Sequence, residues 1–283
     1  MIVDGRAIAT EGLARTKERA SMLARTPRVL AVVTSDTPAT RSYLAIKTKR
    51  ATEAGCALDI VQFREDTSTE ILAAAVRSSD AEAVIVQLPL PQQVDTREVC
   101  NAIPASKDAD VLSDAAREKF EKGDHDALLP PVVSAVREIL ENNRIPVKGK
   151  KAVVVGAGFL VGAPVATWLL QQGAHVHQVT IENSVEVKNL LGEADIIVSG
   201  AGSPHLIKPE VLKEGVVLID AGTSESGSTI SGDADPACVA KCLLFTPVPG
   251  GVGPLAVACL FDNAVTLTKK TTQTHTQSHS VRA

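Results

Sequence analysis

Short apolar runs rich in β-branched residues alternate with helical stretches along most of the chain, and this alternation limits the folds open to it. The predicted strands lie at 29–34, 58–63, 83–88, 151–155, 174–180, 195–199 and 216–220. The predicted helices lie at 41–54, 69–78, 131–142, 161–172 and 185–191, with a final helix at about 254–270. Strands that alternate with helices favour parallel sheets covered by helices. The sequence therefore predicts an α/β fold.

Two domains are expected, because the alternation is interrupted by an Asp/Gly/His turn that ends at Asp126. Residues 1–126, joined by the helix at 254–270, would form the first α/β domain. Residues 127–253 would form a second, Rossmann-like domain, with an active cleft between the two. Residues 271–283 are rich in Thr, Ser, Gln and His, which predicts a disordered tail.

Composition excludes several classes of protein. The 283 residues carry a net charge of −4 and only one Trp, one Tyr and five Phe, which argues against a nucleic-acid partner. No apolar run has the length of a membrane span, and the N-terminus does not have the pattern of an export signal. Cys238 and Cys242 are close enough for a zinc site, but no second Cys or His cluster accompanies them. Free thiols in a cytoplasmic protein without a bound metal are the preferred interpretation.

A glycine loop follows the strand at 151–155. Gly156, Ala157, Gly158 and Gly162 form a G-x-G-x-x-x-G pattern between an apolar strand and a helix. Glycines in this context let the backbone approach a pyrophosphate at the helix N-terminus. The spacing is one residue longer than the commonest fingerprint, so a purely structural turn stays open as the alternative.

Two further positions bear on a dinucleotide. Glu182 lies 20 residues beyond Gly162, where a carboxylate can accept hydrogen bonds from ribose hydroxyls and repel a 2′-phosphate. NAD is therefore favoured over NADP, although Glu182 could equally be a solvated loop residue. Thr223 follows a strand that ends at Asp220, at the edge of the sheet where ligands bind in open α/β folds.

The segment from Thr246 to Pro254 holds three glycines and three prolines in close succession, including Pro249, Gly250 and Gly251. Small, rigid residues of this kind allow a flat ring to approach the backbone. A structural linker into the last helix is the weaker alternative.

Tyr43, the only tyrosine, and Lys47 are four residues apart, so on a helix they share one face. Burial would lower the pKa of the Lys47 amine and suit it to proton transfer. Gln87 could hydrogen-bond this amine, and Asp110 adds a carboxylate on a later loop. Each of these residues, taken alone, could also have no catalytic role, and Lys47 could be an ordinary solvated lysine.

Together these segments resemble the bifunctional methylenetetrahydrofolate dehydrogenase/methenyltetrahydrofolate cyclohydrolase family, in the family's order from about residue 2 to 270. The matching stretches are 2–9 (IVDGRAIA), 37–47 (TPATRSYLAIK), 86–91 (VQLPLP), 107–110 (KDAD), 232–235 (GDAD) and 246–254 (TPVPGGVGP). The resemblance implies oxidation of 5,10-methylenetetrahydrofolate with NAD or NADP, and hydrolysis of the product to 10-formyltetrahydrofolate. It also implies tetrahydrofolate derivatives as ligands and a homodimer formed through the cofactor domain.

The resemblance assigns roles to individual residues. Tyr43 would stack on the folate, Lys47 would act as general acid/base, Gln87 would position Lys47, and Asp110 would hold the pterin. The nicotinamide would lie near Pro249, Gly250 and Gly251, which would also border the substrate.

This chain departs from the family pattern at several positions. Ala157 and Gly158 stand where the family usually has Arg and Ser, and Ile181 and Glu182 replace a polar or basic group, so ligands of a 2′-phosphate are missing. Val111 replaces a glycine after Asp110, and residues 130–133 read Pro-Pro-Val-Val where the family has Pro-Cys-Thr-Pro. A monofunctional cyclohydrolase with a degraded cofactor site, or a non-catalytic dinucleotide-binding relative, are the alternative functions.

Overall fold

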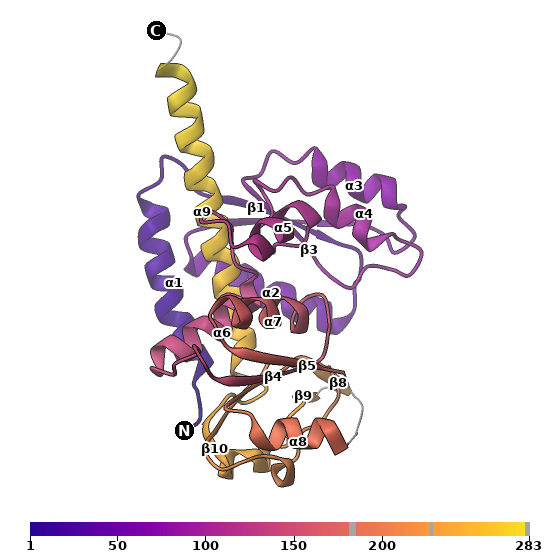
Figure 1. The fold of residues 1–283 in the computed structure, drawn as a ribbon. Coiled ribbons are helices and arrows are strands. Elements are labelled where there is room, and N and C mark those ends of the chain that lie inside the picture. Colours follow the sequence, from indigo (N-terminus) through magenta and orange to yellow (C-terminus); the bar gives the residue numbers. More distant parts are fainter. Residues whose placement is uncertain (181–184, 227–228, 281–283) are drawn as a thin grey trace. The chain divides into compact units, whose positions relative to one another are not determined.

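The computed structural model describes residues 1–180, 185–226 and 229–280, and the chain divides into two units (Figure 1). One comprises Thr10–Pro131 and Val257–Ala283, and we call it the N-terminal unit. The other comprises Met1–Ala9 and Val132–Ala256, and we call it the glycine-loop unit. Each unit is described by itself.

The N-terminal unit contains a parallel three-stranded sheet with the order β2-β1-β3. Its strands are β1 (Arg28–Val33), β2 (Ala57–Gln62) and β3 (Ala83–Val86). Its helices include α2 (Pro38–Glu53), α3 (Thr69–Arg77), α4 (Thr96–Asn101) and α5 (Asp114–Lys122). Every residue of β3 is buried, as expected for a strand covered on both faces. The predicted strands of this half are confirmed to within two residues at each end.

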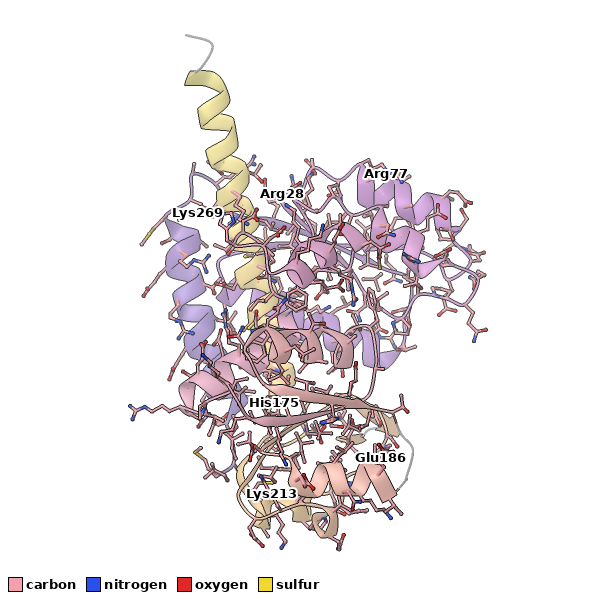
Figure 2. All side chains as sticks on the ribbon, in the orientation of Figure 1. Arg28, Arg77, His175, Glu186, Lys213 and Lys269 are labelled. Atoms are coloured by element: carbon pink, nitrogen blue, oxygen red, sulfur yellow. The ribbon has the colours of Figure 1, made fainter. Side chains whose placement is uncertain are left out.

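Arg28, labelled in Figure 2, lies at the start of β1 and connects all three strands of this sheet. Its guanidinium reaches Asp59 on β2 at 3.2 Å and Asp80, before β3, at 3.0 Å. The backbone register agrees, since Val32 is paired with Val61 on one side and Val86 on the other. The carboxyl ends of the strands, where β3 leads into Gln87, therefore lie along one edge.

Helix α2 begins at Pro38 rather than at the predicted Arg41. Thr37 caps it by accepting a hydrogen bond from the backbone N–H of Thr40 at 3.1 Å, and Pro38 occupies the first turn, where its missing N–H costs nothing. The longer helix still carries Tyr43 and Lys47 in its middle.

The glycine-loop unit contains a parallel five-stranded sheet with the order β10-β7-β6-β4-β5. Its strands are β4 (Lys151–Val155), β5 (His175–Val179), β6 (Ile196–Ser199), β7 (Val216–Asp220) and β10 (Cys242–Phe245). Its helices are α6 (Pro131–Asn142), α7 (Gly162–Gln171) and α8 (Val185–Glu193), with short 3₁₀ turns η1 (Pro209–Val211) and η2 (Pro236–Ala240). A small hairpin, β8 (Ser224–Ser226) and β9 (Thr229–Ser231), follows β7. The strand order reverses direction between β4 and β6, which is the topological switch point of a doubly wound sheet.

The first residues of the chain join the glycine-loop unit, whereas the sequence analysis assigned residues 1–126 to the first domain. Val3 donates its backbone N–H to Phe245 O at 2.9 Å, and Phe245 donates to Met1 O at the same distance. These bonds place the N-terminus against β10. Because this pairing joins residues more than 240 positions apart, no local sequence pattern indicates it.

Two long helices complete the described chain: α1 (Gly5–Ser21) and α9 (Val252–Ser280). Helix α9 begins two residues before the predicted start and extends past residue 270 to Ser280, where the composition predicted a disordered tail. Its apolar side chains, among them Leu255, Phe261 and Leu267, are buried.

Across the described residues, no helix is both long and apolar enough to cross a membrane. The five cysteines are free thiols, and four of them are buried. In the same part of the chain, no three His, Cys, Asp or Glu side chains are grouped as a metal site would require.

Candidate active site

In the N-terminal unit, the amine of Lys47 donates a hydrogen bond to the side-chain oxygen of Gln87 at 2.8 Å. Lys47 lies in the middle of α2, and Gln87 is the first residue after β3. Tyr43 lies one helical turn before Lys47, and 37% of its surface is exposed. The structure thus brings together Lys47 and Gln87 as the sequence predicted and places Tyr43 on the same helix face.

Gln87 is held in an orientation that presents its oxygen to the lysine. Its backbone N–H donates to Val32 O at 2.9 Å, and its side-chain amide donates to Leu88 O at 2.9 Å. Because the amide nitrogen is engaged by Leu88 O, the side-chain oxygen is left as the acceptor for Lys47. The next peptide bond, Leu88–Pro89, is cis.

Charge interactions connect Lys47 to Asp110. Burial lowers the pKa of the Lys47 amine below its usual value, while attraction to Asp110 opposes this shift. Burial raises the pKa of Asp110 to about 6; Lys47 counteracts the rise, and the nearby charge of Asp108 adds to it. An amine and a carboxyl group whose pKa values both move toward neutrality can exchange protons with a bound molecule at physiological pH.

In the glycine-loop unit, the turn after β4 allows very close contacts between backbone segments. Gly156 has a φ of 106°, a conformation that favours glycine. A Cβ on Gly162 would lie 2.1 Å from Gly156 O, so no other residue fits there. Gly158 differs, because a Cβ there would have Gly200 O as its nearest neighbour at 3.9 Å. The backbone beside Gly158 is therefore open, at the entry to helix α7.

The switch point coincides with this turn. Gly156 follows β4 and Gly200 follows β6, and a Cβ on Gly156 would lie 2.8 Å from Gly200 O. A Cβ on Gly200 would in turn lie 2.3 Å from Cγ1 of Val161. No motif in the sequence marks Gly200, and its position directly after a strand is the one signal that indicates it. Two neighbouring strands thus end in glycines at the edge where doubly wound sheets bind ligands.

Two buried aspartates shape the same edge of the sheet. Asp233 accepts hydrogen bonds from the Ser199 hydroxyl at 2.6 Å and from the backbone of Ala201 at 2.7 Å and of Ser203 at 2.8 Å. Asp220 accepts from the backbone of Gly222 at 3.0 Å and of Ala234 at 2.8 Å, and burial raises its pKa to about 6. Asp233 belongs to the Gly-Asp-Ala-Asp stretch at 232–235, and Asp220 at the end of β7 accepts the N–H of the next residue, Ala234.

The proline–glycine segment packs against the start of the chain. A Cβ on Gly5 would lie 1.8 Å from Gly251 O, so these two backbones touch directly. Gly250 has a φ of 114°, and Gly251 donates its N–H to Pro247 O at 2.8 Å. The Val248–Pro249 peptide bond is cis. The requirement for small residues at Gly5 and Gly251 therefore comes from each other as well as from any ligand.

Thr223 and Glu182 were also predicted to bind the cofactor. Thr223 follows β7 and is exposed. Glu182 lies outside the described residues, so its predicted role at the ribose stays a prediction.

A parallel sheet with a glycine turn at its switch point, in a chain with a second α/β unit that carries a half-buried lysine amine, defines a two-domain dinucleotide-binding protein. Two family models match the chain. The catalytic domain of tetrahydrofolate dehydrogenase/cyclohydrolase matches residues 3–110, and its NAD(P)-binding domain matches residues 130–272. The chain belongs to the tetrahydrofolate dehydrogenase/cyclohydrolase family.

Curated relatives agree over nearly the full length. A bifunctional protein FolD from a Hydrogenobaculum species is 33% identical over 270 residues, which cover 93% of this chain and 97% of the relative. The bifunctional protein FolD of Methanosarcina mazei is 34% identical over 278 residues, covering 95% and 96% respectively.

Solved structures share the fold. The bifunctional FolD methylenetetrahydrofolate dehydrogenase/cyclohydrolase of Campylobacter jejuni gives a TM-score of 0.90 at 30% identity, covering 95% of this chain and 99% of that chain. The Trypanosoma brucei enzyme, solved with NADP and an inhibitor, gives a TM-score of 0.90 at 30% identity, covering 96% and 98%. The prediction of two α/β domains, the second one binding NAD(P), is confirmed.

Proposed function

We propose that the chain oxidises 5,10-methylenetetrahydrofolate to 5,10-methenyltetrahydrofolate with a nicotinamide dinucleotide, and hydrolyses that product to 10-formyltetrahydrofolate. The observation that carries this proposal is the Lys47–Gln87 hydrogen bond beside Asp110, in a chain with a glycine turn at the switch point of its other sheet. The names of the FolD relatives support the same pair of activities.

Lys47 carries the hydrolytic step. Its neutral form accepts a proton from water as the water oxygen bonds to the methenyl carbon. The resulting ammonium returns that proton to the ring nitrogen as the carbon–nitrogen bond breaks, and the remaining hydroxyl proton leaves to solvent. A lowered pKa suits the amine to both directions of transfer, and Gln87 fixes its position without adding a charge.

Tyr43 and Asp110 would hold the folate. The exposed phenol ring of Tyr43 offers a flat apolar surface for a folate ring one turn from Lys47. Asp110, in its ionised form, would accept hydrogen bonds from the N–H groups of the pterin.

The glycine-loop unit fits a dinucleotide. Gly156 and Gly162 form a turn that any side chain would fill, and the open backbone at Gly158 leaves room for a pyrophosphate. These residues, with Ala157 and Thr223, would hold the cofactor. The chemistry that such a group supplies when bound is acceptance of a hydride from the methylene carbon. The segment at Pro249, Gly250 and Gly251 would border the reacting rings.

NAD is the cofactor that we propose for this chain. Ala157 and Gly158 offer no cationic or hydroxyl side chain for a 2′-phosphate, in contrast to the Arg and Ser that the family usually has. A carboxylate at Glu182 would disfavour the phosphate further.

We also propose a homodimer that forms through the glycine-loop unit. Strand β5 is an edge of the five-stranded sheet, so a second copy could continue the sheet there. Light scattering coupled to size-exclusion chromatography would show twice the chain mass, and a monomer at micromolar concentration would contradict this proposal.

The function is tested by two assays on the purified protein. One follows reduced dinucleotide with methylenetetrahydrofolate and either NAD or NADP; the other follows loss of methenyltetrahydrofolate without any dinucleotide. We expect both activities, with NAD preferred, and we expect Lys47→Ala to abolish the hydrolysis. Lys49→Ala is the matched control, because Lys49 lies on the same helix but is exposed and 4.0 Å from Glu53.

Hydrolysis without oxidation would leave a monofunctional cyclohydrolase. Binding of NAD with neither activity would leave a non-catalytic relative. Either result would contradict the bifunctional assignment, as would full hydrolysis by Lys47→Ala.

A further inference from the structure

The carboxylate of Asp108 closes the turn that carries Asp110. Asp108 is fully buried; its Oδ1 accepts a hydrogen bond from the backbone of Leu112 at 3.0 Å, and its Oδ2 accepts one from the backbone of Ser113 at 2.7 Å. The two bonds bracket residues 109–111, so Asp110 lies within a loop whose ends are held together by one side chain. Hydrogen bonds from a carboxylate to backbone N–H groups are among the stronger kinds in proteins.

Both ends of this turn are attached to secondary structure. Before it, Val84 on β3 donates its backbone N–H to Lys107 O at 2.8 Å. After it, the Ser113 hydroxyl caps α5 by accepting from the backbone of Ala116 at 3.2 Å. Asn263 on α9 donates to Ala109 O at 2.9 Å. None of these three bonds involves Asp110 or Val111, so the middle of the turn depends on Asp108.

The middle of the turn is strained. Val111 has a φ of 57°, in the left-handed region, and it is the only β-branched residue with a positive φ among the described residues. Branched side chains rarely adopt this conformation, because the Cβ substituents crowd the backbone. Other conformations are open to this valine, and each would point the neighbouring Asp110 elsewhere. Some interaction must therefore keep the turn in its strained form.

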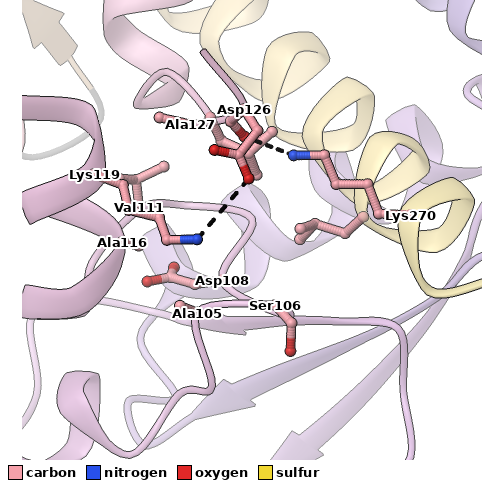
Figure 3. A pocket seen from close by; sticks show the side chains of 11 residues that line it. Ala105, Ser106, Asp108, Val111, Ala116, Lys119, Asp126, Ala127 and Lys270 are labelled. Carbon is pink, nitrogen blue, oxygen red and sulfur yellow. Dashed lines mark hydrogen bonds and ion pairs between the residues drawn. The ribbon is translucent and has the colours of Figure 1, made fainter. Parts of the chain in front are cut away.

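Packing behind the turn is incomplete. A cavity of about 180 Å³ lies there, lined by Ala105, Ser106, Asp108, Val111, Lys119 and Lys270 among others (Figure 3). Figure 3 shows Lys119 and Lys270 reaching toward Asp126. The Lys119 amine is 4.0 Å from the Asp126 carboxylate, and the Lys270 amine donates to the backbone carbonyl of Asp126 at 2.6 Å. Because side chains do not fill the space behind Val111, close packing alone does not hold the turn.

We propose that Asp108 is the positioning residue of this site: its two hydrogen bonds hold the strained turn at Val111 and thereby fix the Asp110 carboxylate relative to Lys47. The proposal rests on the proposed function, because Asp110 matters only if folate binds there. Asp108 has a second effect, since its charge opposes ionisation of Asp110. The charged groups that act on Asp110 are Lys47 from α2 and Asp108 from its own turn.

The test uses Asp108→Asn in the full-length protein. The amide keeps one acceptor but turns a nitrogen toward a backbone N–H, so one of the two bonds is lost. We expect the KM for methylenetetrahydrofolate to rise roughly tenfold, as for the loss of one buried hydrogen bond to a charged group. The KM for the dinucleotide should stay unchanged. The acidic limb of the pH profile should move to lower pH, because Asp110 loses a repelling neighbour.

Rescue separates positioning from simple damage. Glycine adopts a positive φ without strain, so Val111→Gly added to Asp108→Asn should restore most of the KM, although the pH limb stays displaced. Asp124→Asn, which removes an exposed carboxylate of the same unit, is the control and should change neither quantity.

Three outcomes would overturn the proposal. A folded Asp108→Asn protein with unchanged folate KM and pH profile would overturn the proposal, and so would a KM defect that Val111→Gly leaves untouched. If Asp108→Asn does not fold, the variant that combines Asp108→Asn with Val111→Gly is compared with Val111→Gly alone. Identical pH profiles of these two proteins would overturn the proposal. A wild-type protein without either activity would instead refute the proposed function.

Discussion

The Lys47 amine and the Gln87 side-chain oxygen, 2.8 Å apart, join the middle of helix α2 to the end of strand β3. The acceptor is neutral, so it fixes the amine in place without stabilising its charge as a carboxylate would. Burial can then lower the pKa of the amine. A proton carrier of this kind needs both a fixed position and a pKa below that of an ordinary lysine, and this pair provides both.

Replacing Gln87 by glutamate should separate these two requirements. The carboxylate would keep the contact with Lys47 but raise the pKa of the amine by charge attraction. We expect hydrolysis of methenyltetrahydrofolate to fall at pH 7 by about tenfold or more, and the basic side of the pH profile to move upward. Initial rates between pH 6 and pH 10 measure both effects.

Gln62→Glu is a matched control for this change. Gln62 ends the edge strand β2 and donates to the carbonyl of its neighbour Phe63 at 3.1 Å, as Gln87 does to Leu88. Among the described residues its side chain bonds to the Phe63 carbonyl and not to a lysine, so its replacement should leave the pH profile in place. A displacement of equal size in both variants would argue against a specific role for Gln87.

Folate binding should weaken as the pH falls through about 6. Burial raises the pKa of Asp110 to that value, and its protonated form loses acceptor capacity for the N–H groups of the pterin. Titration of a folate ligand by fluorescence or calorimetry at pH 5, 6, 7 and 8 would measure the effect. Asp110→Asn should bind weakly at every pH, and a wild-type affinity that is constant from pH 5 to pH 8 would contradict the role of Asp110.

The ionisation of Asp110 should lower the free energy of unfolding, although it favours folate binding. The folded-state pKa of Asp110 is raised, so its contribution to stability is complete below about 4 and is lost as the pH rises through about 6. Relative to wild type, Asp110→Asn should therefore gain stability at pH 8 compared with pH 4, by about 2 kcal/mol. Urea unfolding at the two pH values gives this difference, and a gain at pH 4 instead would refute the sign.

Cofactor preference should respond to the glycine loop. A Cβ at Gly158 meets Gly200 O only at 3.9 Å, so a side chain fits there. We expect Ala157→Arg combined with Gly158→Ser to improve kcat/KM for NADP relative to NAD by tenfold or more, since it restores cationic and hydroxyl ligands for a 2′-phosphate. Gly162→Ala is the contrasting variant, because its Cβ would lie 2.1 Å from Gly156 O and should prevent dinucleotide binding altogether. An unchanged ratio in the double variant would place the preference elsewhere.

The variants Val111→Gly and Val111→Ala should show an unusual order of stability. At an ordinary buried site, glycine is worse than alanine as a replacement for valine. At a φ of 57°, alanine loses packing and keeps a backbone strain of about 1–2 kcal/mol, whereas glycine loses slightly more packing and no longer has that strain. We expect Val111→Gly to be at least as stable as Val111→Ala in urea unfolding. A clear advantage for alanine would mean that the turn relaxes when the valine is removed.

The sequence indicates the parallel strands well, because buried strands such as 151–155 and 216–220 are continuous apolar runs and their bounds match the structure. It indicates helix α1 poorly. Only one face of α1 is buried, and beside Leu13 this face carries the small or polar side chains Ala9, Thr16 and Ala20, so the apolar periodicity is weak. Strand β10 does not stand out, because only Leu244 and Phe245 of its four residues are buried.

The residues of the candidate site also divide into those that a local pattern indicates and those that depend on the packing of distant segments. Tyr43 and Lys47 are related by helix periodicity, and the glycine turn by its place between strand and helix, so local pattern was enough to find them. The pairing of Lys47 with Gln87 was suggested, but its geometry depends on how β3 packs beside α2. Gly200 and the anchoring bonds of Asp108 escaped notice, because their role exists only where segments distant in sequence meet.

Residues 1–5 contact a strand and a turn that are synthesised more than 240 residues later. Met1 donates to Leu243 O at 2.9 Å, and the backbone of Gly5 touches that of Gly251. During translation residues 1–5 emerge well before the strand and turn that receive them, which follow more than 240 residues later. The glycine-loop unit therefore cannot be finished in the order in which its residues are made, and a tag added at Met1 would lie beside β10.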